Sequence, residues 1–202
     1  MKRIINLLFN DFTHDNRVLK ISRSLQNAGF DVLLVATHFD QNLPKEEKIE
    51  GFKVRRFNVG RFNILPINLL IFWFVVVKNF RKEKIFHAND LYALPPAYFI
   101  KRFFNRDCKI VYDCHEHETE AKIYLKKPVM KKLAKIFERR MIKLADEVIT
   151  VSESIAEEYV QMYDIRKPHL VLNTPNHSKE QNNDLFRKNL GIEKDKVIFL
   201  FQ

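Results

Sequence analysis

Residues 2–37 read KRIINLLFNDFTHDNRVLKISRSLQNAGFDVLLVAT, and the order of elements in this stretch indicates the fold class. Residues 2–9 and 31–37 are apolar runs of strand length. Residues 15–28, between them, place apolar side chains on one helical face. Gly29 then suits the end of that helix. A buried strand, a helix and a second buried strand in this order predict neighbouring parallel strands.

The same alternation continues along the rest of the chain. Continuous apolar strands separated by helical patterns predict a Rossmann-like α/β fold, doubly wound, with a mainly parallel sheet and helices on both faces. Pro95 and Pro96 leave open whether the helix predicted from residue 91 begins only at Leu94. The further strands are predicted at 53–57, 84–88, 109–113, 147–151 and 169–172, and the further helices at 67–81, 91–104, 128–145 and 153–163.

The domain organisation follows from where this alternation stops. Residues 1–175 are predicted to form one Rossmann-like domain, and the polar residues 176–195 a linker. Residues 196–202, KVIFLFQ, are interpreted as the first strand of a second domain whose remainder is absent. The alternative is that this strand joins the first sheet.

Composition bounds the class of protein. The 202 residues are 46% hydrophobic and 30% charged, which is typical of a globular protein. Two cysteines argue against a disulfide scaffold and favour the cytoplasm. The longest apolar run, residues 64–77, is too short to cross a bilayer and is interpreted as a buried or an interfacial helix. The net charge of +10 indicates an anionic partner or, alternatively, a solvated lysine-rich surface.

Ligands of doubly wound sheets bind outside the carboxyl ends of the strands, so the loops there are the candidate sites. The loop after the first strand enters a helix, whose N-terminus suits a phosphate group. Helix capping by Asp15 or Thr13 is an equally good explanation of its polar residues. A dinucleotide site is disfavoured because the loop lacks the G-x-G-x-x-G pattern. The candidate substrate-binding residues of this loop are Thr13, His14, Asn16 and Arg17.

Two later loops follow strands in the same way. Asn89 and Asp90 are candidates for substrate binding or for capping the next helix. Residues 113–118, DCHEHE, combine histidine, cysteine and carboxylate side chains. These side chains are crowded into one short loop and lack the spacing that directs ligands onto one metal ion, so no metal is predicted. The alternatives left are acceptor binding by His115 or Glu116 and a solvated polar loop.

The predicted helix 128–145 has a basic face. Ile136 and Ile142 lie among the basic residues, and a second, apolar stripe containing Leu133 and Phe137 is expected to face the core. A basic face with apolar insertions favours an anionic membrane surface over nucleic acid, although a solvated face is the alternative. The predicted membrane-facing residues are Lys131, Lys132, Lys135, Arg139 and Lys143.

Several segments in order resemble the N-terminal domain of family 4 glycosyltransferases, which is one half of a GT-B fold. The resemblance spans nearly the whole chain. It implies a retaining enzyme that transfers a sugar from a nucleotide sugar to an acceptor, without a cofactor or required metal. The matching segments are HDNRVLKISRSLQNAGFDVLLVA, IFHANDLYALPPAYFIKR, KIVYDCHEHETE, ADEVITVSESIAEEY, LVLNTPN and LGIEKDKVIFLFQ.

The resemblance also assigns roles to particular residues. His115 matches the catalytic histidine that lines the cleft near the transferred sugar, and Asn173 matches the residue that heads the interdomain crossover. The loop from Phe12 to Arg17 matches one that usually carries glycines near the donor phosphates, but this loop has none. The donor half of the enzyme is expected to be missing, so this chain alone is expected to be inactive.

The leading functional prediction is therefore the acceptor-binding half of a glycosyltransferase of bacterial surface polysaccharide synthesis. Its partners would be a nucleotide sugar, held mostly by the missing domain, a glycan or lipid-linked acceptor, and the inner face of the plasma membrane. The alternatives are a fragment of a sugar-nucleotide epimerase with the same architecture, and a basic module that binds membrane or nucleic acid without catalysis.

Overall fold

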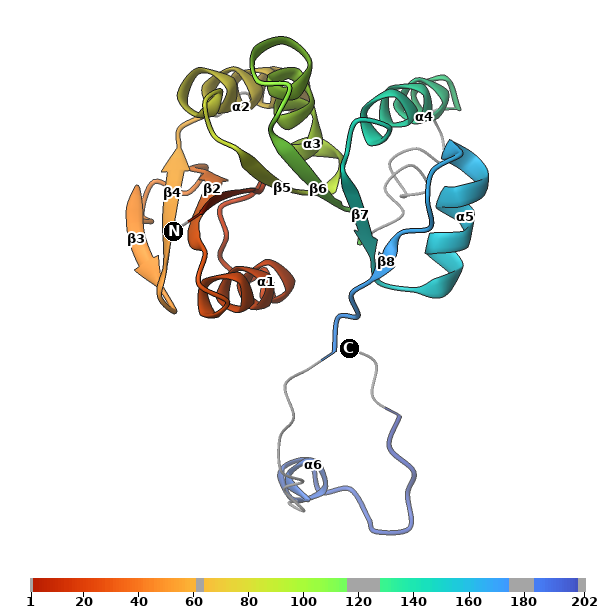
Figure 1. The fold of residues 1–202 in the computed structure, drawn as a ribbon. Helices are drawn as coiled ribbons and strands as arrows, with labels where there is room; N and C mark the ends of the chain where they lie inside the picture. The colour runs from red at the N-terminus through yellow and green to blue at the C-terminus, as the bar shows by residue number, and fades with distance from the viewer. Residues whose placement is uncertain (1, 61–63, 116–127, 175–183, 200–202) are drawn as a thin grey trace.

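The computed structural model describes residues 2–60, 64–115, 128–174 and 184–199. Eight strands form one sheet in the order β3-β4-β2-β1-β5-β6-β7-β8 (Figure 1). All neighbouring strands are parallel except β3 and β4. The strands are β1 (Arg3–Leu7), β2 (Asp31–Thr37), β3 (Glu46–Ile49), β4 (Phe52–Phe57), β5 (Ile85–Asn89), β6 (Lys109–Asp113), β7 (Glu147–Thr150) and β8 (His169–Leu170).

Helices cover both faces of this sheet. Helix α1 lies on one face, and α2, α3 and α4 lie on the other (Figure 1). Helix α5 follows β7, and α6 follows β8 in the chain. The doubly wound, mainly parallel fold predicted from the sequence is thereby confirmed. The helices are α1 (Asn16–Asn27), α2 (Leu65–Phe80), α3 (Asp90–Phe99), α4 (Pro128–Ile142), α5 (Glu153–Tyr163) and α6 (Leu185–Leu190).

The sheet separates two apolar cores, because successive side chains of a strand point to opposite faces. Leu34 and Val54 belong to the core on the α1 face, whereas Leu33 and Val35 belong to the core on the α2–α3 face. Continuous apolar strands such as DVLLVAT thus supply both cores at once. This explains why the central strands could be predicted from their composition.

Several predicted boundaries are confirmed and a few are wrong. The ranges 31–37, 109–113 and 153–163 agree with the structure residue by residue. Helix α3 begins at Asp90 with both prolines inside it, and a π-helical turn, Ile100–Phe104, follows it. Strand β3 and helix α6 were not predicted. Residues 196–199 belong to no strand in the described part of the chain, and the division into domains stays a prediction.

The orientation predicted for α4 is wrong in part, although Met141, another apolar residue of the predicted core-facing stripe, is buried. Leu133 and Phe137, expected in the core, are 60% and 38% exposed, whereas Ile142, expected among the outward basic residues, is buried. The physical reason is the fully buried Glu138. Its carboxylate accepts hydrogen bonds from three tyrosine hydroxyls, at 2.6–3.0 Å, and these bonds fix which side of α4 faces inward. The tyrosines are Tyr112, Tyr159 and Tyr163.

Among the described residues, no helix combines the length and the hydropathy that a membrane span requires. The most apolar helix, α2, has 16 residues. At about 1.5 Å of rise per residue, α2 is roughly 24 Å long and falls short of a hydrocarbon core of about 30 Å.

Candidate functional site

Asp113, the last residue of β6, is the centre of a buried cluster at the carboxyl edge of the sheet. Its side chain is fully buried, and Arg17 of α1 binds it with two hydrogen bonds of 2.8 and 2.9 Å. Arg17 is itself buried and donates a third hydrogen bond, of 2.8 Å, to the Val171 carbonyl. A charge can be held in the interior when it is paired and hydrogen-bonded in this way.

Two histidines approach the same carboxylate, one from the neighbouring strand β5 and one from the chain just after β6. His87 of β5 has its Nε2 atom 3.7 Å from Asp113, and His115 has its Nδ1 atom 3.5 Å from it. The other ring nitrogen of His115, Nε2, lies 3.3 Å from Asp90. His115 therefore sits between two carboxylates, with its side chain 16% exposed at the edge of the sheet.

The charges in this cluster shift the pKa values of its members. Burial alone would raise the pKa of Asp113, but contacts with His115, His87 and Arg17 outweigh it and hold the pKa well below the usual range. Burial lowers the pKa of His115, but Asp113 and Asp90 raise it more, so the net shift is upward. The arrangement therefore favours an anionic Asp113 and a cationic His115.

Asp90 is held in an unusual backbone conformation. It begins α3 with φ of +69°, in the left-handed region that non-glycine residues rarely adopt. Such strain costs of order 1–3 kcal/mol and is often found at functional sites. The conformation accompanies the contact between the Asp90 carboxylate and His115.

Asn89 does not have the capping role that the sequence suggested as one possibility. Its side chain makes no capping hydrogen bond. It is fully buried and donates to the Asn6 side chain at 2.6 Å and to the Leu7 carbonyl at 2.8 Å. Asn6 in turn donates to Ser22 of α1 at 2.9 Å. Because β1 offers these acceptors, Asn89 joins β5 to β1 and α1.

The loop between β1 and α1 is built without glycine. Phe12 is buried with φ of +53°. Asp15 caps α1 by accepting a hydrogen bond from the Val18 amide at 3.0 Å, as one of the two capping alternatives predicted. The predicted substrate residues Thr13, His14 and Asn16 are exposed at this edge.

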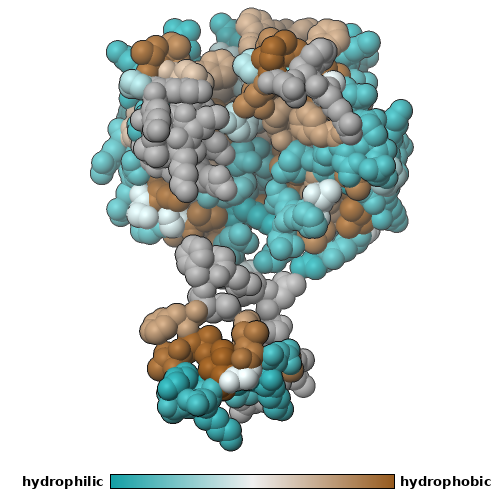
Figure 2. Space-filling model, turned by 180° about the vertical axis from the view of Figure 1, so that it is seen from behind, coloured by the Kyte–Doolittle hydropathy of each residue, from teal (hydrophilic) through white to brown (hydrophobic). Residues whose placement is uncertain are grey.

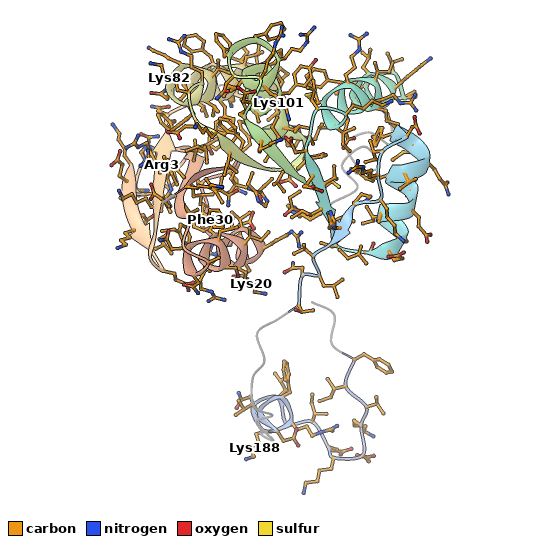
Figure 3. All side chains as sticks on the ribbon, viewed as in Figure 1. Arg3, Lys20, Phe30, Lys82, Lys101 and Lys188 are labelled. Atoms are coloured by element: carbon orange, nitrogen blue, oxygen red, sulfur yellow. The ribbon has the colours of Figure 1, made fainter. Side chains whose placement is uncertain are left out.

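A groove of about 440 Å³ lies between α1 and the ends of the central strands. Arg17 and His87 connect it to the Asp113 cluster, and the exposed Asn173 lines it as well. Lys20 of α1 donates a hydrogen bond of 2.6 Å to the Thr174 carbonyl at the side of the groove, on the face opposite α2 (Figure 3). The other residues that line the groove are Ile21, Ser24, Leu25, Val111, Ile149, Val171 and Leu172.

Four of the five predicted membrane-facing residues are brought together in a second pocket, of about 480 Å³, between α4 and α5. Arg139 also donates a hydrogen bond to the Met162 carbonyl of α5. Lys143 does not line this pocket but a neighbouring one near β7. The four basic residues are Lys131, Lys132, Lys135 and Arg139.

The structure brings together only some of the predicted catalytic and substrate-binding residues. His115, Asp90 and Arg17 meet at the Asp113 cluster, whereas Thr13, His14 and Asn16 remain on the loop surface. Glu116 lies outside the described residues, as do His117 and Glu118. Within the described part, no three His, Cys, Asp or Glu side chains are grouped so as to hold a metal ion.

Asp113 is the centre of the site, a role that was not predicted from the sequence. The available signal was an acidic residue closing a buried apolar strand, which needs a cation nearby. That cation, Arg17, is 96 positions away in the chain, so the pair becomes visible only through the fold.

Comparisons with known proteins agree with this architecture. The chain resembles sucrose-phosphate synthase from Thermosynechococcus elongatus, with a TM-score of 0.67, 15% identity and coverage of 96% of this chain and 54% of the synthase. Anabaena HepE, solved in complex with UDP, gives a TM-score of 0.60 with 16% identity, covering 95% of this chain and 50% of HepE. A comparison with curated protein sequences gives no match.

The UDP-GlcNAc 2-epimerase of Methanocaldococcus jannaschii is similar as well, with a TM-score of 0.54 at 13% identity, over 85% of this chain and 45% of the epimerase. At these identities the likeness concerns the fold, which is one half of a GT-B structure. The chain spans about half the length of these proteins. The sequence pattern of Glycosyltransferase Family 4 matches residues 15–175, which is most of the chain. The chain therefore belongs to Glycosyltransferase Family 4.

Proposed function

We propose that this chain is the acceptor-binding half of a retaining glycosyltransferase that moves a sugar from a nucleotide sugar to a lipid-linked glycan in bacterial surface polysaccharide synthesis. One observation carries the proposal. A family 4 domain presents His115, flanked by Asp113 and Asp90, at the carboxyl edge of its sheet. Ligands of this fold class bind at that edge.

His115 is the proposed catalytic residue, through contact with the transferred sugar. Its ring is oriented from both sides, by Asp113 at Nδ1 and by Asp90 at Nε2. A cationic ring there would oppose the charge that develops on the departing diphosphate. Arg17 is a positioning residue in this scheme, because its donors bind Asp113 and the Val171 carbonyl.

The acceptor and the donor would approach from different sides. Thr13, His14 and Asn16 are exposed beside the cluster and are proposed to contact the acceptor, as is Glu116. Asn173 heads the connection to the other half, which would hold the nucleotide. No metal or cofactor is invoked in this scheme.

A peripheral position at the inner face of the plasma membrane is part of the proposal. Lys131, Lys132, Lys135 and Arg139 line one pocket, and Ile136 lines it with them. Cations that converge in this way suit lipid phosphates, and each contributes about 1 kcal/mol near an anionic leaflet. The acceptor would then be a lipid-linked sugar within reach of the same surface.

The test offers the 202-residue chain two kinds of compound, nucleotide sugars and a lipid-linked sugar. In calorimetry, UDP-glucose and GDP-mannose are expected to bind weakly or not at all, and micromolar binding would contradict the assignment to the acceptor half. In nanodiscs, a polyprenyl-diphosphate sugar should shift the NMR signals of the His115 ring. The variant Asn27→Ala, at the exposed end of α1, serves as a control and should behave like the wild type.

A second arm uses the complete enzyme. There, His115→Ala should lower the turnover number while leaving the protein folded. Turnover equal to that of the wild type would refute the role of His115. The family match supports the transferase and lends no support to the epimerase or to a nucleic-acid module.

A further inference from the structure

Helix α2 has an apolar face that the described part of the protein leaves exposed. Residues 64–77, ILPINLLIFWFVVV, contain no charged side chain. Leu69, Phe72 and Val76 are buried against the sheet, as expected for a helix of this composition. The opposite side is equally apolar, yet Leu70 is 59% and Phe74 is 66% exposed. A helix that is apolar all round is normally buried, so this face indicates a contact with something else.

The exposed face of α2 continues onto α4. Trp73 of α2 stacks on Phe137 of α4 with ring centroids 6.3 Å apart, which joins the two helices across the start of α3. Trp73 also donates a hydrogen bond of 2.9 Å to the Tyr92 carbonyl of α3. Figure 2 shows hydrophobic residues gathered along the upper edge of the molecule, the side on which Figure 1 places α2, α3 and α4.

We call this the two-helix apolar surface. It has two parts, one from each helix. Its exposed members are Ile64, Leu65, Ile67, Leu70 and Phe74 near or within α2, and Val129, Met130, Leu133 and Ile136 of α4.

Basic side chains flank this surface at both of its ends. The uncharged stretch of α2 is followed by four exposed cations, and the pocket of four cations between α4 and α5 adjoins the other part. Figure 3 places Lys82 on the α2 side of the sheet, opposite the Lys20 side. The four cations after the uncharged stretch are Lys78, Arg81, Lys82 and Lys84.

We propose that the two-helix apolar surface inserts into the acyl boundary of an anionic lipid bilayer, with α2 lying in the plane of the membrane interface. Apolar side chains bordered by cations match the two regions of such a bilayer, the acyl chains and the phosphate headgroups. This inference deepens the membrane part of the proposed function, and it adds an inserting element, α2, to the basic α4.

The direction of the chain gives this surface a consequence for the candidate site. Helix α2 begins after the carboxyl end of β4, and α4 begins after the carboxyl end of β6. The apolar members Ile64, Leu65, Val129 and Met130 therefore lie toward the edge of the sheet that carries His115. Insertion would bring that edge close to the headgroups, where the sugar of a lipid-linked acceptor is located.

A second copy of the chain fits this surface less well than a lipid bilayer does. The net charge is +10, and pairing two such surfaces would bring their flanking cations together. An acidic protein partner would satisfy the cations but would need a matching apolar surface. These two occupants are the competing outcomes of the experiment.

The first measurement uses tryptophan fluorescence, because Trp73 is the single tryptophan of the chain. In a Trp73→Phe background, Phe74→Trp places the probe on the surface, and Asn27→Trp places it on exposed α1, across the sheet. Vesicles of phosphatidylcholine and phosphatidylglycerol with brominated acyl chains should quench the probe at 74 strongly and leave the probe at 27 unaffected. The proposal would be overturned if both probes were quenched equally. It would also be overturned if neither probe were quenched although the protein sediments with the vesicles.

The second measurement keeps Trp73 in place and leaves the net charge unchanged. The pair Leu70→Gln and Phe74→Gln should weaken partitioning onto these vesicles by about tenfold, since burying one such side chain is already worth that much. The control pair Leu172→Gln and Phe186→Gln alters side chains that are 62% and 52% exposed elsewhere and should change little. Equal losses in both pairs would refute a specific surface.

Oligomeric state and acceptor binding separate the remaining outcomes. If the wild type is a dimer in light scattering and the Leu70→Gln and Phe74→Gln pair is a monomer, the surface is an interface between copies and the proposal is wrong. If the pair abolishes insertion while a detergent-solubilised lipid-linked sugar still shifts the His115 signals, the membrane inference holds independently. Loss of the His115 response with insertion intact would contradict only the proposed function.

Discussion

The Arg17–Asp113 pair offers the sharpest test of how the candidate site is held together. We predict that Arg17→Met, which keeps most of the side-chain volume, markedly destabilises the protein. The substitution removes two hydrogen bonds to Asp113 and one to the Val171 carbonyl. It leaves a carboxylate in a fully buried position without its closest cation.

The magnitude follows from the burial of both partners. Removing one member of a buried ion pair costs about 3–5 kcal/mol, because the remaining charge is left uncompensated. His115 and His87 remain 3.5 and 3.7 Å from Asp113, so we expect the lower half of that range. For a chain of this length, the lower half of the range, about 3–4 kcal/mol, corresponds to a fall in melting temperature of roughly 6–16 °C.

A matched control lies on the same helix. Arg23 also binds a carboxylate, that of Glu50, at 3.1 Å, but both side chains are more than a third exposed. Exposed pairs contribute about 0–1 kcal/mol, so Arg23→Met should change the free energy of unfolding little. The assay is urea unfolding of both variants at neutral pH. A difference below about 1 kcal/mol between them would refute the reasoning.

The pH dependence provides an independent check. The folded-state pKa of Asp113 is depressed, so its stabilising contribution is present above its unfolded value of about 3.9 and is lost as pH falls through the folded value. Arg17→Met should raise that folded pKa. The stability gap between variant and wild type should therefore narrow below about pH 4, where Asp113 in the variant becomes protonated.

Three further predictions test the neighbouring features. By NMR, the pKa of His115 should lie above the ordinary value of about 6.5 and should fall in Asp90→Asn. Because that folded-state pKa is raised, the stabilisation from the charged ring is present below about pH 6.5 and is lost as pH rises through the folded value. An unshifted pKa would contradict the interaction of His115 with the two carboxylates. Glu138→Gln should cost at least about 1–3 kcal/mol in urea unfolding, because one tyrosine hydroxyl loses its acceptor, and exposed Glu157→Gln should cost almost nothing. Neutralising the α4 lysines should weaken sedimentation with anionic vesicles most at low salt, and the same result from the β3–β4 lysines would show that only net charge matters. The two sets are Lys131, Lys132 and Lys135 to Gln, and Lys45, Lys48 and Lys53 to Gln.

The central strands were predictable because parallel strands buried on both faces need continuous apolar sequence. Strand β3 reads EEKI and has no such signal. It exists because Glu46–Ile49 pairs with Phe52–Phe57 across a turn, a contact that composition does not report. The candidate loops could be predicted for the same reason as the strands, because each loop follows the end of a strand. The hydrogen-bond and ion-pair partners of the side chains in these loops could not be predicted.

Side-chain partners depend on which strands become neighbours. Asn89 was a plausible cap by its position, but β5 pairs with β1, where Asn6 and the Leu7 carbonyl accept its hydrogen bonds. Asp113 meets Arg17 because α1 packs beside the carboxyl end of β6. Neither pairing can be predicted from local sequence, because the fold determines which partner a buried polar side chain meets.

Helix α4 shows how one buried polar residue changes the functional interpretation of a whole helix. Hydrophobic periodicity assigns Leu133 and Phe137 to the core, and it gives no sign that Glu138 is buried. Three tyrosine hydroxyls on β6 and α5 instead provide a carboxylate-binding site inside the protein. Satisfying Glu138 turns α4 so that Ile142 is buried and Leu133 is exposed. The same network that fixes α4 on the sheet therefore leaves apolar side chains beside the exposed face of α2. Weakening it through Glu138 should loosen the two-helix apolar surface without altering any residue on that surface.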